Sequence, residues 1–141
     1  MEKECKGGYI VEIDKLEYYI GERLKTLTDI QVYNKKVPDN KTFPYLVYKF
    51  YACNYAVRHR KDWILEIDYW QDSNDDTDIL EAAITVKNGR TVDEIDYVGL
   101  NNSTQNETEG FYQCTAEFEG SIPDTEPNIS RYNQRFILKV D

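Results

Sequence analysis

Two neighbouring segments in which apolar and polar residues alternate constrain the fold of this chain most strongly. "YLVYKFYACNY" (45–55) and "KDWILEIDYWQD" (61–72) are rich in aromatic and β-branched residues, which favour strands. In the second segment, one alternate set is Trp63, Leu65, Ile67 and Tyr69, and the other is Ile64, Glu66, Asp68 and Trp70. Side chains that alternate in this way point to opposite faces of a sheet. The connection "AVRHRK" (56–61) fits a hairpin, so the sequence predicts that these two strands pair.

An amphipathic pattern on each side of this pair predicts two helices. Residues 11–27 place apolar side chains at helical spacing, namely Ile13, Leu16, Ile20, Leu24 and Leu27. Gly21 weakens this helix by about 1 kcal/mol relative to alanine, and we expect close packing against a neighbour to account for it. A second helix is predicted over residues 73–89, with Gly89 as its C-cap. Its predicted apolar face consists of Ile79, Leu80, Ala83 and Val86.

The rest of the chain predicts further strands joined by turns and loops. "DIQVYNK" (29–35) reads as a short strand, and residues 111–122 and 130–141 are two more alternating strands. Between these last two lies "PDTEPN" (123–128), whose two prolines exclude it from a central strand. The polar residues from about 101 to 110 predict an exposed, flexible loop.

Alternation within the first of the two C-terminal strands predicts which of its side chains are buried. The apolar set is Cys114, Ala116 and Phe118, and Glu117 and Glu119 alternate with it. We therefore expect both glutamates on the solvated face. With this strand included, the element order is α-β-β-β-α-β-β. That order predicts a single α+β domain over all 141 residues, with two helices packed on one face of a mainly antiparallel sheet.

The charge and composition of the chain exclude several classes of function. A net charge of -9 argues against a nucleic-acid grip, which needs cations near the phosphates, and against an anionic membrane surface. The N-terminus lacks an apolar stretch, so we expect no secretory signal. The three cysteines share no short spacing and are typical of reduced thiols in a cytosolic protein. Twelve tyrosines favour strands and contact surfaces, because the ring packs on one side and meets water on the other.

The acidic stretch "QDSNDDTDILEAA" (71–83) raises the question of a calcium loop. Read as an EF-hand, it places oxygen ligands at positions one, three, five and seven of the loop, namely Asp72, Asn74, Asp76 and Asp78. The sixth position, which needs glycine, is Thr77, and the twelfth, which needs a bidentate glutamate, is Ala83. The loop therefore lacks both its sharp turn and its closing ligand, and we predict no metal site here.

A helix start explains the same carboxylates more simply. Ser73 is a suitable N-cap, and Asp76 follows it three residues later, as in a capping box. Asp75, Asp76 and Asp78 would then lie in the first turn, where the helix dipole favours a carboxylate by about 0.3–1 kcal/mol. We predict that these residues begin the second helix.

Other chemical patterns give no catalytic, cofactor-binding or metal-binding residues. His59 is the sole histidine, and Arg58, Arg60 and Lys61 surround it, so no carboxylate is in place to orient it. No cysteine pair has zinc spacing, and no glycine-rich loop has phosphate-binding spacing. The four-residue basic cluster is either a solvated loop or a docking point for an acidic partner. We name it and the "PDTEPN" turn as candidate protein interfaces, with the residues Arg58, His59, Arg60, Lys61, Asp124, Glu126 and Pro127.

Four segments together resemble a known family. They are the amphipathic N-terminal helix, "TFPYLVYKF", "KDWILEIDYWQDSNDDTDILEAA" and "FYQCTAEFEGSIPDTEPNISRYNQRFILKV". In this order they resemble the small tail terminator proteins of long-tailed bacteriophages, also called tail completion or head–tail joining proteins. The resemblance extends over most of the chain, except the first few residues and residues 90–110.

The resemblance implies a virion structural protein with no catalytic residues. It implies an α+β domain that assembles with other copies into a ring, usually a hexamer, at the head-proximal end of the tail. Such a ring ends polymerisation of the tail tube protein and joins the tail to the head connector or stopper protein. DNA only passes through the ring, and the protein occupies the host cytoplasm during assembly and the virion tail afterwards.

Two other classes of function stay open from the residues alone. One is an acidic cytosolic inhibitor or immunity-type protein that masks a basic partner, which the charge of -9 and the many tyrosines would suit. The other is a small metal-dependent hydrolase that uses Asp68, Asp72 and Asp76.

Overall fold

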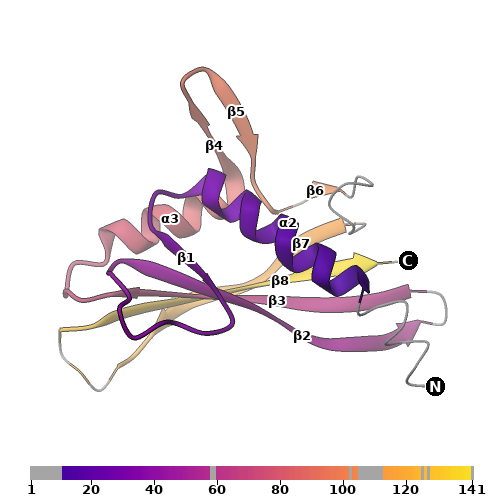
Figure 1. Ribbon diagram of the computed structural model, residues 1–141, viewed down its shortest axis with the longest axis horizontal. Coiled ribbons are helices and arrows are strands. Elements are labelled where there is room, and N and C mark those ends of the chain that lie inside the picture. The colour runs from indigo at the N-terminus through magenta and orange to yellow at the C-terminus, as the bar shows by residue number, and fades with distance from the viewer. Residues whose placement is uncertain are drawn as a thin grey trace.

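The computed structural model describes residues 11–57, 60–101, 103–104, 113–124, 126 and 128–140. It consists of two layers, a twisted sheet and a pair of helices that both lie on one side of it (Figure 1). The α+β class and the packing of both helices on one sheet face, predicted from the sequence, are confirmed. In chain order the elements are α2 (Val11–Leu27), β1 (Gln31–Asn34), β2 (Tyr45–Val57), β3 (Arg60–Gln71), α3 (Thr77–Asn88), β4 (Gly89–Val92), β5 (Ile95–Val98), β6 (Ser103–Thr104), β7 (Gln113–Ile122) and β8 (Ser130–Val140).

The sheet is mainly antiparallel, with one parallel edge. Its strand order in the described part of the chain is β1-β2-β3-β8-β7-β6, and only the β1–β2 pair is parallel. The predicted pairing of the two long aromatic strands is confirmed as β2–β3. β4 and β5 form a separate hairpin that projects from the helix side of the molecule, away from the sheet (Figure 1).

The core lies between the helices and the face of the sheet that they cover. The apolar stripe predicted for α2 is buried at Leu16, Ile20, Leu24 and Leu27, and the predicted inner face of β3 is buried at Leu65, Ile67 and Tyr69. In α3 the prediction needs one correction, because Ala82 is buried and Leu80 is only partly so. The buried set is Ile79, Ala82, Ala83 and Val86, which follows the spacing of a single helical stripe.

Gly21 allows close packing between α2 and β2, as the sequence predicts. A Cβ atom at this position would collide with the Tyr48 hydroxyl. Because the space is open, the Tyr48 hydroxyl donates a hydrogen bond to the carbonyl of Glu17 at 2.9 Å. Burial, followed by the nearby Glu17 and Glu22, raises the pKa of Tyr48 to about 12. The glycine therefore fixes how near the helix lies to the sheet.

A β-bulge in β7 overturns the predicted placement of Phe118 and Glu119. The register against β8 shifts between Ala116 and Phe118, which inserts one extra residue into β7. Such a bulge reverses which face the following side chains occupy. Phe118 is therefore 49% exposed on the face away from the helices, while Glu119 turns towards α3 and forms an ion pair with Lys87.

The start of α3 also differs from the prediction. The helix begins at Thr77, so a capping box from Ser73 to Asp76 is wrong. The preceding residues form local turns instead: Ser73 Oγ accepts the Asp75 N–H at 3.0 Å, and the Asp75 carboxylate accepts the Thr77 N–H at 3.0 Å. These short-range bonds compete with helix formation. Asp78 is the acidic residue in the first turn, and Gly89 ends the helix at φ 90°, which confirms the predicted C-cap.

The segment after α3 contains structure that the sequence did not predict. The hairpin of β4 and β5 occupies residues that lack an alternating pattern, and Leu100 beyond it is fully buried. Ser103–Thr104 pairs with the start of β7 as β6 rather than lying in a free loop. The remainder of the predicted flexible loop, at residues 102 and 105–110, lies outside the described residues.

Candidate protein interface

One face of the sheet is left uncovered by both described helices (Figure 1). We call this surface the open face. Cross-strand register places its side chains in rows that run from β2 through β3 and β8 to β7. Its main members are Tyr45, Lys49, Tyr51, Glu66, Asp68, Trp70, Phe118, Ile122, Arg131, Asn133 and Arg135.

The first row consists of two aromatic side chains, Tyr45 and Trp70, followed by Arg131 and Ile122. The rings of Tyr45 and Trp70 are stacked, with centroids 6.2 Å apart and planes 15° apart. The Arg131 guanidinium carbon lies 4.1 Å from the centre of the Trp70 ring, a cation–π contact. Tyr45 is almost fully buried by its neighbours, and burial raises the pKa of its hydroxyl despite the opposing effect of Arg131. The stack holds Arg131 in place without an ion pair to any described carboxylate.

The second row is centred on Glu66, whose carboxylate accepts several hydrogen bonds from neighbouring side chains. The side chain of Glu66 is only 8% exposed, and it accepts hydrogen bonds from the Tyr51 hydroxyl, from Asn133 at 3.0 Å and from Arg135 Nε at 3.1 Å. Lys49 Nζ lies 3.8 Å away. Burial alone would raise the pKa of Glu66, but these hydrogen bonds and the Arg135 charge outweigh burial, so the pKa is lowered. Glu66 is therefore an ionised carboxylate that stabilises the surface from within.

Between the two rows, two buried polar atoms have no hydrogen-bond partner. Asn133 is 4% exposed, and its amide nitrogen donates to Glu66 and, at 2.7 Å, to Asp68. These bonds leave Asn133 Oδ1 without a donor, and Arg131 Nε likewise has no acceptor. A buried polar atom without a partner costs about 1–3 kcal/mol. Both residues line a shallow hollow of about 430 Å³, together with Glu66, Asp68, Phe118, Ile122 and Arg135.

The charge that the open face offers to a partner differs in sign from that of the chain. It carries two carboxylates, Glu66 and Asp68, against three cationic side chains, Lys49, Arg131 and Arg135, and Arg131 has no ion pair to a carboxylate of the described residues. Arg135 stands 47% exposed, with its guanidinium 5.9 Å from the ring of Phe118. Aromatic and arginine side chains around a central hollow are typical of the energetic centres of protein interfaces. The open face is thus an aromatic surface with a small excess of cationic side chains, on a chain of net charge -9.

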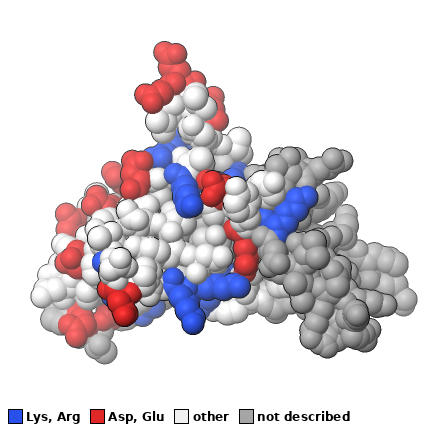
Figure 2. Space-filling view, in the orientation of Figure 1, with Lys and Arg blue, Asp and Glu red and all other residues white. Residues whose placement is uncertain are grey.

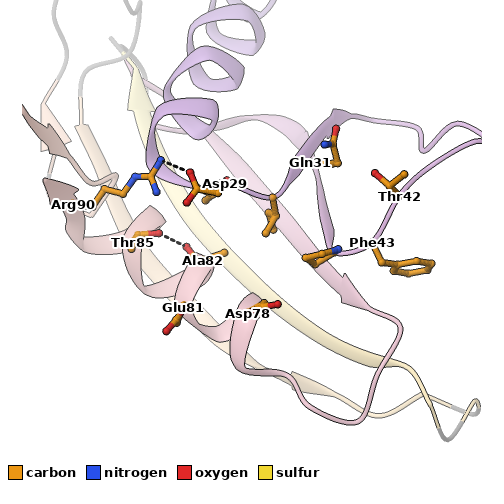
Figure 3. A pocket seen from close by; sticks show the side chains of 12 residues that line it. Asp29, Gln31, Thr42, Phe43, Asp78, Glu81, Ala82, Thr85 and Arg90 are labelled. Carbon is orange, nitrogen blue, oxygen red and sulfur yellow. Dashed lines mark hydrogen bonds and ion pairs between the residues drawn. The ribbon is translucent and has the colours of Figure 1, made fainter. Parts of the chain in front are cut away.

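A second pocket lies on the helix side, between the end of α2, β1 and α3 (Figure 3). It encloses about 420 Å³. Arg90 at its edge is already engaged, since it donates to Asp29 at 3.1 Å and to the carbonyl of Thr26 at 3.0 Å. Asp78 and Glu81 of α3 also line the pocket, and both are exposed. The Arg90 hydrogen bonds connect β4 to the end of α2. The residues that line this pocket indicate no particular ligand.

The residues named from the sequence as candidate interfaces lie, where they are described, at opposite ends of the sheet. Arg58, His59 and Pro127 lie outside the described residues. Arg60 and Lys61 belong to β3 rather than to a loop, because the strand pairs with β2 and β8 from its first residues. Asp124 and Glu126 form a local turn in which the Asp124 carboxylate accepts the Glu126 N–H at 2.8 Å. Register against β8 places this turn at the opposite end of the sheet from Lys61.

The three aspartates of the hydrolase hypothesis are also not assembled into a site. Asp68 is bound to Asn133 on the open face, Asp72 is exposed after β3, and Asp76 is the N-cap of α3. Across the described ranges, no group of three or more acidic, histidine or cysteine side chains is arranged to hold a metal ion.

The residues of the open face that sequence patterns did not single out are Arg131, Asn133 and Arg135. They form the polar alternate set of "SRYNQRFILKV", and β8 is an interior strand of the sheet. The signal in the sequence that could have identified this surface is the presence of two arginines and an asparagine on one face of an interior strand.

Comparison with models of known protein families and with curated proteins finds no match to this chain. Within the described residues, no helix has both the length and the apolar character that are needed to span a membrane.

Proposed function

We propose that this protein is a tail terminator of a long-tailed bacteriophage. It forms a ring at the head-proximal end of the tail, ends polymerisation of the tail tube and joins the tail to the head connector. The resemblance of four sequence segments supports this proposal, and the α+β fold with two helices on one sheet face is the fold that the resemblance implies.

The open face is the observation that carries the proposal. A ring of identical subunits needs two different surfaces on each subunit, so that the contact repeats head to tail and closes by rotation. The open face supplies one such surface, since it has aromatic anchors, arginines and unpartnered polar atoms. The projecting β4–β5 hairpin supplies a second, dissimilar surface on the other side of the molecule (Figure 1).

The charge of the chain supports passage of DNA through such a ring. Assembly multiplies the net charge of -9. Carboxylates around a channel repel the phosphate backbone, so DNA passes without sticking to the wall.

The test is to add the purified protein to growing tail tubes and to measure tube length by electron microscopy. A tail terminator caps one end of each tube with a ring and stops its growth. Tubes that keep growing at the same rate, with no added density at either end, would contradict the proposal. Formation of a tight one-to-one complex with a basic protein, with no effect on tubes, would favour the inhibitor hypothesis instead.

A further inference from the structure

The β4–β5 hairpin is a projecting arm with an acidic tip. The space-filling view shows acidic side chains at its outer end (Figure 2), where Asp93, Glu94 and Asp96 are all exposed. One apolar side chain next to the tip, Ile95, is also exposed, at 54%. The outer end of the arm therefore presents carboxylates together with an apolar side chain.

The base of this arm is firmly held. Gly89 and Gly99 approach so closely that a Cβ atom on either would collide with the backbone. Arg23 of α2 donates a hydrogen bond to the carbonyl of Val98 at 2.7 Å, and Arg90 reaches back to α2 in the same way. The arm is therefore presented in a fixed direction, away from the sheet.

The two residues at the tip of the arm occupy a strained backbone conformation. Asp93 has φ 51° and Glu94 has φ 68°. A two-residue hairpin turn with both φ values positive strongly prefers Asn-Gly, because glycine relieves the strain. The chain instead places two carboxylates there, which favours a role for their charge.

The open face has the complementary properties. It offers the Arg131 guanidinium, which stacks on Trp70 and has no ion pair to a carboxylate of the described residues. Arg135 beside it is 47% exposed, and both arginines line the hollow. A segment of protein that carries carboxylates would form charged hydrogen bonds with such guanidinium groups.

We propose that the acidic tip of the β4–β5 hairpin of one copy docks on the open face of a second copy. The arm projects from the helix side and the open face is on the opposite side of the sheet, so a chain cannot make this contact with itself (Figure 1). Asp93 and Glu94 meet Arg131, and the exposed Ile95 next to the tip approaches Phe118 and Ile122 across the hollow. The contact rests on the proposed ring and identifies the two surfaces that join its subunits.

The contact repeats head to tail, because its two halves are different surfaces. Such a contact closes into a ring if each step rotates the subunit by a suitable angle, and otherwise produces an open filament. The acidic tip and the cationic hollow belong to the same chain, so every added copy brings both halves.

Charge reversal on each side, followed by mixing, tests the contact. The tip variant is Asp93→Lys with Glu94→Lys, and the face variant is Arg131→Glu. Sedimentation velocity over a concentration series measures association. Each variant alone should associate about tenfold or more weakly than the wild type, because like charges then face each other. An equimolar mixture should recover association, because each lysine tip then meets a glutamate face and each native tip meets a native face.

Matched controls carry the same charge changes at exposed sites away from both surfaces. Asp39→Lys with Glu81→Lys matches the tip variant, and Lys41→Glu matches the face variant. Both controls should associate as the wild type does. Recovery in the mixture also shows that both variants are folded.

The contact is overturned if the tip variant associates as the wild type does, if the mixture fails to recover, or if the wild type stays monomeric up to about 1 mM. Its failure is distinguishable from failure of the proposed function. Wild-type chains that form open filaments and do not cap tubes would keep the contact and contradict the tail-end ring. Tubes that are capped normally by both single variants would keep the proposed function and contradict the contact.

Discussion

The two faces of the sheet differ in how completely their groups are satisfied. The face under the helices is apolar, and its main buried polar group, Gln134, is hydrogen-bonded to Tyr69, to the Ala83 carbonyl and to Glu119. The open face also contains buried polar side chains, and it leaves Arg131 Nε and Asn133 Oδ1 without partners, whereas among the described residues of the helix side one such atom, Gln71 Oε1, lies at the end of β3. The covered face is sealed by apolar packing against the two described helices. The open face instead presents arginine and aromatic side chains to solvent, and this contrast underlies the proposed contact between copies.

The largest expected effect is a difference in stability between alanine substitutions of two phenylalanines on adjacent strands. Phe136 is fully buried on the covered face, and Phe118 is 49% exposed on the open face. Phe136→Ala should lower the free energy of unfolding by about 3–5 kcal/mol, because it leaves a cavity in the core. Phe118→Ala should lower it by less than about 1 kcal/mol. Urea unfolding of both variants measures this difference, and equal losses would contradict the distinction between the faces.

A second expected effect tests the close approach of α2 to the covered face. Gly21→Ala should lower the free energy of unfolding by about 1–3 kcal/mol, because the added methyl group collides with the Tyr48 hydroxyl. In the Tyr48→Phe background the colliding oxygen is absent, so the same substitution should cost much less or even stabilise the helix. A double-mutant cycle by urea unfolding gives the coupling. Purely additive effects would show that Tyr48 does not set the helix position.

A third effect, with a defined pH dependence, concerns Glu66 on the open face. Glu66→Gln should lower the free energy of unfolding at pH 7 by about 1–3 kcal/mol, because its charged hydrogen bonds are weakened. The exposed Glu117→Gln on β7 is the matched control and should change stability little.

The sign of the pH dependence follows from the lowered pKa of Glu66. The folded-state pKa lies below the ordinary value of 4.5, so the ionised carboxylate stabilises the fold above about pH 4.5. That contribution is lost as the pH falls through the folded-state pKa. The difference in stability between wild type and Glu66→Gln should therefore shrink below pH 4.5. A difference that grows on acidification would contradict the described hydrogen bonding.

The smallest expected effect is at Arg131. Arg131→Met should change the free energy of unfolding of the monomer by no more than about 0.5–1 kcal/mol, because loss of the cation–π contact is offset by removal of an unpartnered buried donor. Thermal unfolding at low protein concentration measures this change. A loss of several kcal/mol would mean that Arg131 has a structural role within its own chain.

Regular periodicity made much of the fold predictable. The stripe of α2, the alternation of β3 and the C-cap at Gly89 are local patterns, and each predicts its element within a few residues. The element order that they give is enough to predict the α+β class. Gly21 was recognisable because a glycine inside an otherwise regular helix indicates close packing.

The features that could not be predicted depend on contacts between distant segments. The bulge before Phe118 is visible only from the register between β7 and β8, and it moves Phe118 to the open face. The hairpin of β4 and β5 has an acidic turn without the Asn-Gly signal that identifies such turns. The hollow of the open face needs side chains from β3, β7 and β8 together, so no single segment contains its pattern.

Photo-crosslinking from the arm tests the central claim most directly. A photoreactive side chain in place of Ile95 keeps all the acidic residues of the tip, and mass spectrometry of the products identifies the peptide that it reaches. The proposed contact predicts crosslinks between two copies, from position 95 to β8 or β7 near Arg131 and Ile122. Crosslinks confined to other surfaces of the second copy, with the open face unlabelled, would contradict it.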